Sequence, residues 1–179
     1  MSEDLRTIRI TNAIKHAFIA LLQEKPFIKI SVSEIAKNAF IDRQTFYLHY
    51  TDKYDLLDKM VQEVAGVFKQ IMSERLQEGH ALNKLKDIYQ NHNAYLQEHR
   101  LEIISLLKID TGDICLKRSL KKIFIEEYQK ETSEHLTQFQ ADMMAALYIQ
   151  TLTLFLDDEK ELNIYEVTDL LEKIKRFIN

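Results

Sequence analysis

The sequence predicts an all-α protein of about nine helices, and three features support this fold class. Glycine occurs three times and proline once in 179 residues, so the chain has few of the residues that interrupt helices. Apolar residues recur three, four and seven positions apart along most of the chain, which is the spacing of one helix face. A hydrophobic content of 46% is enough for a sizeable core. We expect a three-helix domain over residues 1–55 and a larger helical domain over residues 56–179.

The first helix is predicted from Leu5 to Gln23. Its apolar stripe consists of Ile10, Ile14, Ala17, Phe18 and Leu21. Pro26 ends this pattern, and residues 27–30 then form a short apolar bridge. We expect the bridge to place apolar side chains beneath the three-helix domain.

Three further helix starts follow one another closely between residues 31 and 55. Ser31 begins an S-x-x-E capping box. Asp42 can cap a second helix, about two turns long, over residues 43–49. Asp52 can cap a third helix, and Asp55 in its first turn favours the helix dipole. The spacing therefore predicts two short helices and the start of a longer one.

The middle helix has an unusual outer surface. Phe46 and Tyr50, four residues apart, are predicted to face inward. The side chains left outside donate hydrogen bonds or stack, with one leucine among them: Arg43, Gln44, Thr45, Tyr47, Leu48 and His49. A helix, a tight turn and a second helix of this kind present side chains to the major groove of DNA. The alternative is an incidental polar surface, since short helices with mixed faces are common.

The stretch from Ile35 to Leu56, IAKNAFIDRQTFYLHYTDKYDL, resembles the DNA-binding signature of the TetR/AcrR family of bacterial transcriptional regulators. The matching positions are Ile35-Ala36, Ala39, Thr45-Phe46-Tyr47, Tyr50, Asp52-Lys53 and Leu56. The resemblance covers the first third of the chain, and the remainder is similar only in length, helical content and order. The amino-acid sequence from Arg43 onward looks most like that of a branch of the family that includes regulators linked to dihydroxyacetone kinase genes.

Two positions depart from the family pattern. The family usually has glycine in the turn, where this chain has Phe40. A left-handed backbone there costs a residue other than glycine roughly 1 kcal/mol, so we expect the turn to be built differently. The family often has glycine where this chain has Gln44, whose amide could pair with adenine N6 and N7.

The resemblance implies a homodimer that binds double-stranded DNA at a near-palindromic operator. On this hypothesis Arg43, Gln44 and Thr45 contact base edges, and Lys53 and Tyr47 hold phosphates. Ser31 or Ser33 could also hold a phosphate, and His49 could serve either purpose. Residues 1–55 carry a slight excess of basic side chains and the remainder an excess of acids, within a net charge of −4. This asymmetry has the sign expected for phosphate contact, although chance variation explains it equally well.

The fourth helix is predicted from Lys53 to about Leu76, so it links the two domains. We interpret Gly66 in its middle as a site of close packing, with a flexible point as the alternative. Further helices are expected at Leu82–Glu98, Leu101–Ile109 and Ile114–Glu134, with Gly112 ending the second of these.

The last two helices, Phe139–Leu156 and Ile164–Ile178, are rich in apolar side chains. Residues 143–147 are apolar on nearly every side, so this helix must be covered all round. Two copies that pair over about residues 139–156 and 163–178 would form a four-helix bundle. The resemblance implies the same dimer, and the alternative is that both helices pack within one protomer.

The resemblance also implies an unknown small-molecule effector that shifts the fourth helix and so changes the spacing of the two DNA-contacting helices. Aromatic residues that could line its pocket are Tyr89, Tyr95, Phe124, Tyr128 and Tyr148, with plain core packing as the alternative. A basic cluster could form a second nucleic-acid site: Lys117, Arg118, Lys121 and Lys122. We favour a solvated face balanced by Glu126, Glu127 and Glu131.

Other functional classes lack support in the sequence. It has no H-E-x-x-H, C-x-x-C, P-loop, G-x-G-x-x-G or G-x-S-x-G motif, so we expect no cofactor, no metal site and no enzyme activity. The single Cys115 excludes an intrachain disulfide and favours a reducing compartment, the cytoplasm, with a role as a small core residue. No signal peptide and no run of 18 apolar residues is present, so no membrane span is expected. The rival function is a helical protein-interaction module, or a co-activator that has lost its pocket. Repression and activation are not distinguished.

Overall fold

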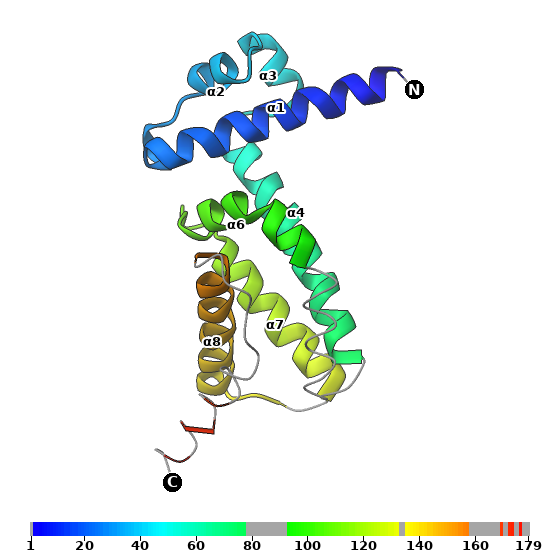
Figure 1. Ribbon diagram of the computed structural model, residues 1–179, viewed down its shortest axis with the longest axis vertical. Helices are drawn as coiled ribbons and strands as arrows, with labels where there is room; N and C mark the ends of the chain where they lie inside the picture. Colours follow the sequence, from blue (N-terminus) through cyan, green and yellow to red (C-terminus); the bar gives the residue numbers. More distant parts are fainter. Residues whose placement is uncertain are drawn as a thin grey trace. The chain divides into compact units, whose positions relative to one another are not determined.

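The computed structural model describes residues 2–77, 93–132 and 135–157, together with Asp169, Glu172, Lys173 and Arg176. All regular elements in these ranges are helical, which confirms the all-α fold class (Figure 1). They are α1 (Ser2–Glu24), η1 (Phe27–Lys29), α2 (Val32–Asn38), α3 (Arg43–His49), α4 (Lys53–Gln77), α6 (Arg100–Leu107), α7 (Leu116–Thr132) and α8 (Gln138–Asp157). Residues 93–98 are helical too and belong to the predicted helix Leu82–Glu98, most of which lies outside the described residues.

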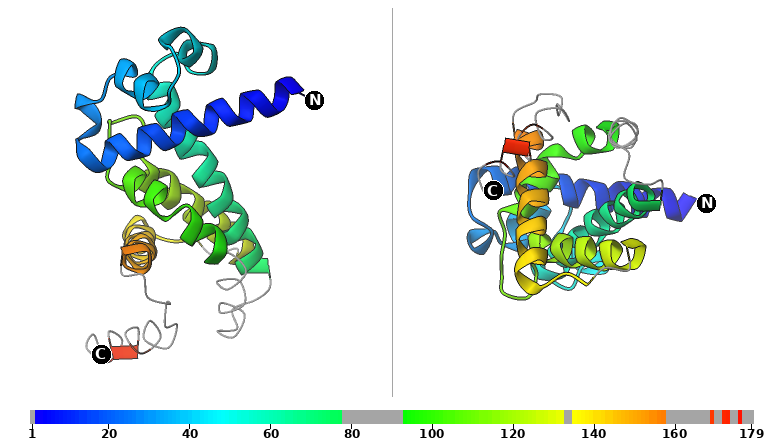
Figure 2. Two further views of the ribbon diagram at one scale, coloured as in Figure 1. Left: turned by 45° about the horizontal axis from the view of Figure 1, so that its top comes forward. Right: turned by 90° about the horizontal axis from the view of Figure 1, so that it is seen from below.

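The chain forms two compact units, each built from two separate stretches of the sequence. Unit 1 consists of Met1–Gly66 and Leu101–Arg118, and unit 2 consists of Val67–Arg100 and Ser119–Asn179. Unit 1 thus contains the predicted three-helix domain, the first half of α4 and α6. Figure 2 shows α1 lying across the start of α4, with α2 and α3 next to it.

The core of unit 1 forms where α1, α2, α3 and α4 meet. Its fully buried side chains include Ile14, Phe18, Ile35, Phe46, Leu56, Leu57 and Met60. Phe27 of η1 contacts two aromatic rings edge-on, with its ring centroid 6.1 Å from that of Phe18 and 5.0 Å from that of Tyr54. Phe27 and Ile30 are buried, which confirms that the bridge places apolar side chains under this unit.

Helix α6 adds a second layer to unit 1. Ile103 and Leu106 are fully buried, and the Gln23 amide of α1 donates a hydrogen bond to the Ser105 hydroxyl at 2.6 Å. The segment after α6 turns at Gly112, whose φ of +89° favours glycine. Arg118 pairs with Asp110 in the same segment at 2.9 Å.

Gly66 does not lie at a close contact, so our interpretation of this residue was wrong. It is exposed, and a Cβ atom added there would meet nothing within 4 Å. Glycine therefore lowers the helix propensity of α4 without any packing gain at this position.

Unit 2 contains α8 and most of α7. Leu120 of α7 is buried, as are Ala141, Ala145, Leu152 and Leu156 of α8. Two lysines of the basic cluster on α7 form ion pairs, one with the expected Glu126 and one with an acid of α8 that we did not expect. Lys121 pairs with Asp142 of α8, Lys122 pairs with Glu126, and the buried Glu127 pairs with Lys130 instead of with the cluster.

One side of α8 is not covered by any of the residues that the structure describes. Phe139 is 73% exposed, Met143 58%, Leu147 37% and Leu154 58%. These residues are four, four and seven positions apart, so they form one stripe, which we call the α8 stripe. The final predicted helix lies largely outside the described residues, where Asp169–Lys173 and Glu172–Arg176 form ion pairs four residues apart. None of the helices in the described part of the chain is long and apolar enough to cross a membrane.

Candidate nucleic-acid interface

The start of α2 is fixed by a reciprocal pair of hydrogen bonds. The Ser31 hydroxyl accepts a hydrogen bond from the Glu34 N–H, and the Ser31 N–H donates to the Glu34 carboxylate at 3.0 Å. This is the predicted capping box. A hydrogen bond from Lys25, followed by those from Ser31, lowers the pKa of Glu34 from 4.5 to about 2.

The turn between α2 and α3 keeps a left-handed backbone in spite of its phenylalanine. Phe40 has a φ of 55°, so our expectation of a different turn was wrong. Its N–H donates to the Lys37 carbonyl at 3.2 Å, and the Ile41 N–H donates to the Ala36 carbonyl at 3.0 Å. This pair of bonds is the Schellman arrangement, which satisfies the last carbonyls of α2 and offsets the strain at Phe40. The Phe40 side chain is 96% exposed.

Helix α3 is capped at its start and anchored along its inner side. The Asp42 carboxylate accepts a hydrogen bond from the Thr45 N–H at 2.6 Å, as predicted. Phe46 is fully buried and Tyr50 is 5% exposed, which confirms the predicted inner side. Burial raises the pKa of Tyr50 to about 12, so its phenol stays neutral at the base of the helix.

The outer side of α3 presents the predicted base-contacting residues. Arg43 and Gln44 are exposed, Tyr47 is 48% exposed, and Thr45 and His49 are half-buried. The Arg43 guanidinium donates a hydrogen bond to the Tyr47 hydroxyl at 3.4 Å and lies 6.0 Å from the centre of its ring. We call the outward side chains Arg43, Gln44, Thr45, Tyr47 and Leu48 the α3 face. No acidic residue occurs in α3, so nothing on this helix repels a phosphate backbone.

The two serines at the start of α2 differ in what they can offer a phosphate. Both are exposed. The Ser31 hydroxyl donates to the Glu34 carboxylate at 2.8 Å, so its proton is already used within the capping box. Ser33 is the second residue of α2 and takes no part in the capping box.

Lys53 has partners that sequence reasoning missed. Its ammonium donates to the carbonyl oxygens of Phe27, Ile28 and Ile30 at 3.1, 3.0 and 2.8 Å. It also lies 4.7 Å from the centre of the Phe27 ring and 5.5 Å from that of Tyr54. Burial lowers the pKa of Lys53, but donation to all three carbonyls at once requires the three N–H groups of its protonated form. Lys53 therefore ties the start of α4 to η1, and its side chain is half-buried.

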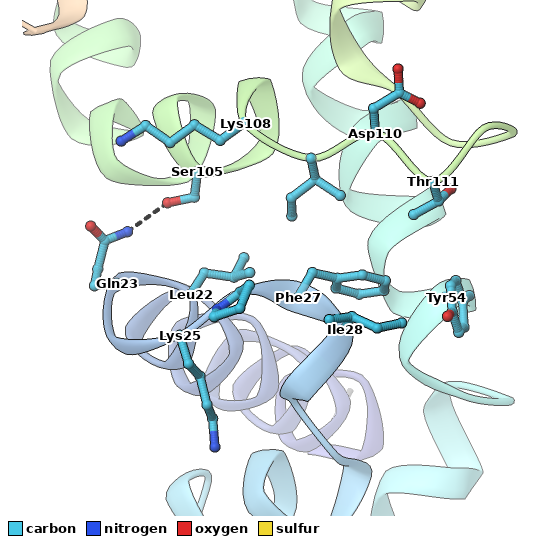
Figure 3. Close-up of a pocket in the computed structure, with 12 residues that line it drawn as sticks. Leu22, Gln23, Lys25, Phe27, Ile28, Tyr54, Ser105, Lys108, Asp110 and Thr111 are labelled. Atoms are coloured by element: carbon cyan, nitrogen blue, oxygen red, sulfur yellow. Dashed lines mark hydrogen bonds between the residues drawn. The ribbon is translucent and has the colours of Figure 1, made fainter.

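Unit 1 also contains a partly open cavity of about 580 Å³, which lies between the end of α1, η1 and the segment that follows α6 (Figure 3). Leu22, Phe27 and Ile28 line one side, and Lys108, Asp110 and Thr111 lie opposite (Figure 3). Ile109 also lines the cavity. The hydrogen bond between Gln23 and Ser105 lies at one end. No local pattern in the sequence signalled this cavity, because its walls come from segments about eighty residues apart.

The residues predicted to line an effector pocket divide into two groups within unit 2. Phe124 stacks with Tyr128 and Tyr148, at centroid distances of 6.2 and 5.6 Å. Tyr95 instead stacks on His99 at 4.3 Å. Tyr89 lies outside the described residues. Three of the five predicted residues therefore form one half-buried aromatic cluster.

Comparison with known proteins finds a family match in the N-terminal part of the chain. Residues 14–60, which run from the middle of α1 to the first turns of α4, match the sequence profile described as "Bacterial regulatory proteins, tetR family". This match covers the helices that carry the candidate interface. The fatty acid metabolism regulator protein of Bacillus subtilis (strain 168) is 28% identical over 109 residues, which are 60% of this chain and 56% of that protein. The uncharacterized HTH-type transcriptional regulator YxbF of the same organism is 40% identical over 60 residues, or 33% of this chain and 16% of that protein.

Solved structures of TetR-family regulators share the fold over nearly the whole chain. A TetR transcriptional regulator from Streptococcus agalactiae 2603V has a TM-score of 0.61 at 21% identity, with 95% of each chain covered. A TetR-family transcriptional regulator from Haemophilus influenzae has a TM-score of 0.59 at 22% identity, with 94% of this chain and 95% of that chain covered. These relatives and solved structures are described as regulators. The narrower resemblance to regulators linked to dihydroxyacetone kinase genes stays a prediction.

Proposed function

We propose that this protein is a TetR-family regulator, which controls transcription by binding a near-palindromic operator as a homodimer. The observation that carries the proposal is the α3 face. It is a capped, acid-free helix surface whose inner side is fixed by Phe46 and Tyr50, so its outer side chains are held in one orientation. Residues 1–55 would provide DNA contact, and residues 56–179 would provide dimerisation and control.

The proposed roles follow the positions of the side chains. Arg43, Gln44 and Thr45 contact base edges, and Tyr47 contacts a phosphate through its hydroxyl. Ser33 and His49 would make further phosphate contacts, and Ser31 would serve mainly as the cap of α2. Lys53 acts by positioning η1 and α4, because its three protons already have acceptors.

The α8 stripe supports a dimer that pairs through the last two helices. Four large apolar side chains on one side of a helix are unfavourable in water, and a second copy would remove them from it. A two-fold axis would place the two α3 helices in successive major grooves, roughly 34–36 Å apart. The operator should then contain two half-sites about one helical turn apart.

The proposal is tested by footprinting across the DNA that flanks the gene. Wild-type protein should protect two half-sites, and Gln44→Ala should weaken binding there by a factor of about ten, as for one lost base contact. Gln62→Ala is the matched control, because Gln62 lies on α4 and bonds only to Asp58 within the described residues. Equal affinities for wild type and Gln44→Ala, or the absence of any footprint, would overturn the proposal.

Control by an unknown small-molecule effector is part of the proposal, and two places within the described residues suit one. The aromatic cluster of Phe124, Tyr128 and Tyr148 is the predicted place. The cavity of unit 1 also has a volume in the range of small-molecule sites. Fatty acids are the first compounds to test, since one relative is described as a fatty acid metabolism regulator. Loss of the effector response in Tyr148→Ala would favour the cluster, and loss in Ile109→Ala would favour the cavity.

A protein-interaction module is the second candidate function. It is favoured by the exposed apolar side chains of Phe40 and Leu48, which could dock on another protein. On this alternative the footprint is absent and alanine at either position abolishes capture of that partner, whereas Gln44→Ala has no effect.

A further inference from the structure

Leu48 is the most exposed large hydrophobic side chain on helix α3. It is 82% exposed, compared with 48% for Tyr47 on the same helix. With about 100° of rotation per residue, Gln44 and Leu48 each lie about 160° from the buried Phe46, on either side of the outward direction. These two side chains therefore form the ridge that projects furthest from unit 1 along this helix.

A leucine on this ridge has only one favourable partner in a major groove. Single exposed apolar residues are normal on protein surfaces, so exposure alone carries no functional meaning. The ridge, however, is the part of α3 that would meet base-pair edges first, and a leucine cannot hydrogen-bond to bases or phosphates. The apolar group that base pairs display in the major groove is the C5 methyl of thymine.

We propose that Leu48 determines operator specificity by packing on a thymine methyl group; this inference rests on the proposed function. Gln44 is one turn earlier on the same ridge, about 6 Å along the helix axis. Base pairs are about 3.4 Å apart, so the thymine lies about two base-pair steps from the base that Gln44 contacts. If Gln44 pairs with an adenine, each half-site contains an adenine and a thymine at this separation.

Replacement of single thymines by deoxyuridine tests the inference, because this change removes the C5 methyl and leaves every hydrogen-bonding group in place. One thymine in each half-site should be sensitive, with binding weakened about fourfold, the effect of one buried methyl group. In Leu48→Ala the same replacement should change binding by less than about 1.5-fold. In Gln44→Ala the sensitivity should persist, since the methyl contact is on a different residue.

A second substitution checks the contact from the other direction. A cytosine at the sensitive position should weaken binding by wild-type protein, and 5-methylcytosine should recover about fourfold of that loss because it restores the methyl group. Leu48→Ala should not distinguish the two bases. The variant should fold normally, because the side chain is exposed, and its melting temperature serves as the check.

The results separate this inference from the proposed function. If wild-type protein protects an operator but no thymine is sensitive to loss of its methyl, or if the sensitivity is unchanged in Leu48→Ala, the role of Leu48 is wrong while DNA binding stands. If no operator is protected, both proposals fail together.

Discussion

Replacing Lys53 with methionine should destabilise the protein, and it tests how unit 1 is held together. Methionine retains most of the apolar stem against the rings of Phe27 and Tyr54 but removes the ammonium. The change therefore removes the hydrogen bonds to the carbonyls of Phe27, Ile28 and Ile30 together with the positive charge over the two rings.

The magnitude follows from these contacts. A hydrogen bond to a charged group contributes about 1.5–3 kcal/mol, and a cation lying over an aromatic ring adds about 0.5–1 kcal/mol. The three bonds share one charge, and the ammonium is only half-buried, so their contributions do not add and water can replace part of them. We expect a loss of about 2 kcal/mol in the free energy of unfolding, which lowers the melting temperature by about 4–8 °C for a chain of this size.

Urea denaturation of wild type, Lys53→Met and Lys37→Met measures the loss. Lys37 is the matched control because it is an exposed lysine in the last turn of α2, and its replacement should change stability by less than about 0.5 kcal/mol. Equal stability of the two variants would refute the reasoning.

The salt dependence of operator binding separates the two roles considered for Lys53. A phosphate contact predicts that Lys53→Met lowers the slope of log K against log salt by about 0.9. The structural role predicts an unchanged slope with weaker binding at every salt concentration, because η1 and α4 are no longer tied together. A lower slope combined with wild-type stability would mean that the ammonium leaves the carbonyls to contact DNA.

Four further predictions concern separate elements. Phe40→Gly should raise the free energy of unfolding by about 0.5–1 kcal/mol by removing left-handed strain, whereas Phe40→Ala should not; equal urea midpoints for the two would contradict the strain argument. Gly66→Ala should raise the free energy of unfolding by about 0.5–1 kcal/mol, because alanine favours a helix more than glycine does. A lower urea midpoint for this variant would show that α4 requires the glycine. Because the pKa of Glu34 is about 2 in the folded protein against an ordinary 4.5, its carboxylate stabilises the fold above pH 4.5, and this contribution is lost as the pH falls towards 2. Glu34→Gln should therefore reduce the loss of stability at acidic pH. If the free energy of unfolding depends on pH in the same way in wild type and variant, Glu34 is not the cause of that loss. Met143→Glu should weaken self-association at least about tenfold in sedimentation experiments, and an unchanged dimer would move the interface away from the α8 stripe.

The sequence alone determined the helices of unit 1 and the orientation of α3. Ser31, Asp42 and Asp52 each contact backbone N–H groups two or three residues further on, so their roles follow from local spacing. Phe46 and Tyr50 are four residues apart, and this interval places both on one side of any helix. The resemblance to TetR-family regulators rests on the same local stretch, because the family's DNA-binding signature lies within it.

Only the tertiary structure decided which partners the long and exposed side chains have. The three carbonyls that hold Lys53 are 23 to 26 residues away, and the cavity joins segments 82 residues apart through Gln23 and Ser105. At Phe40 the residue type alone indicates the cost of a left-handed backbone, but the two hydrogen bonds that offset this strain depend on how α2 ends. Caps and helix faces depend on atoms within one or two turns, which the sequence specifies directly. The partner of a flexible side chain depends instead on which distant backbone the whole fold brings within about 3 Å of it.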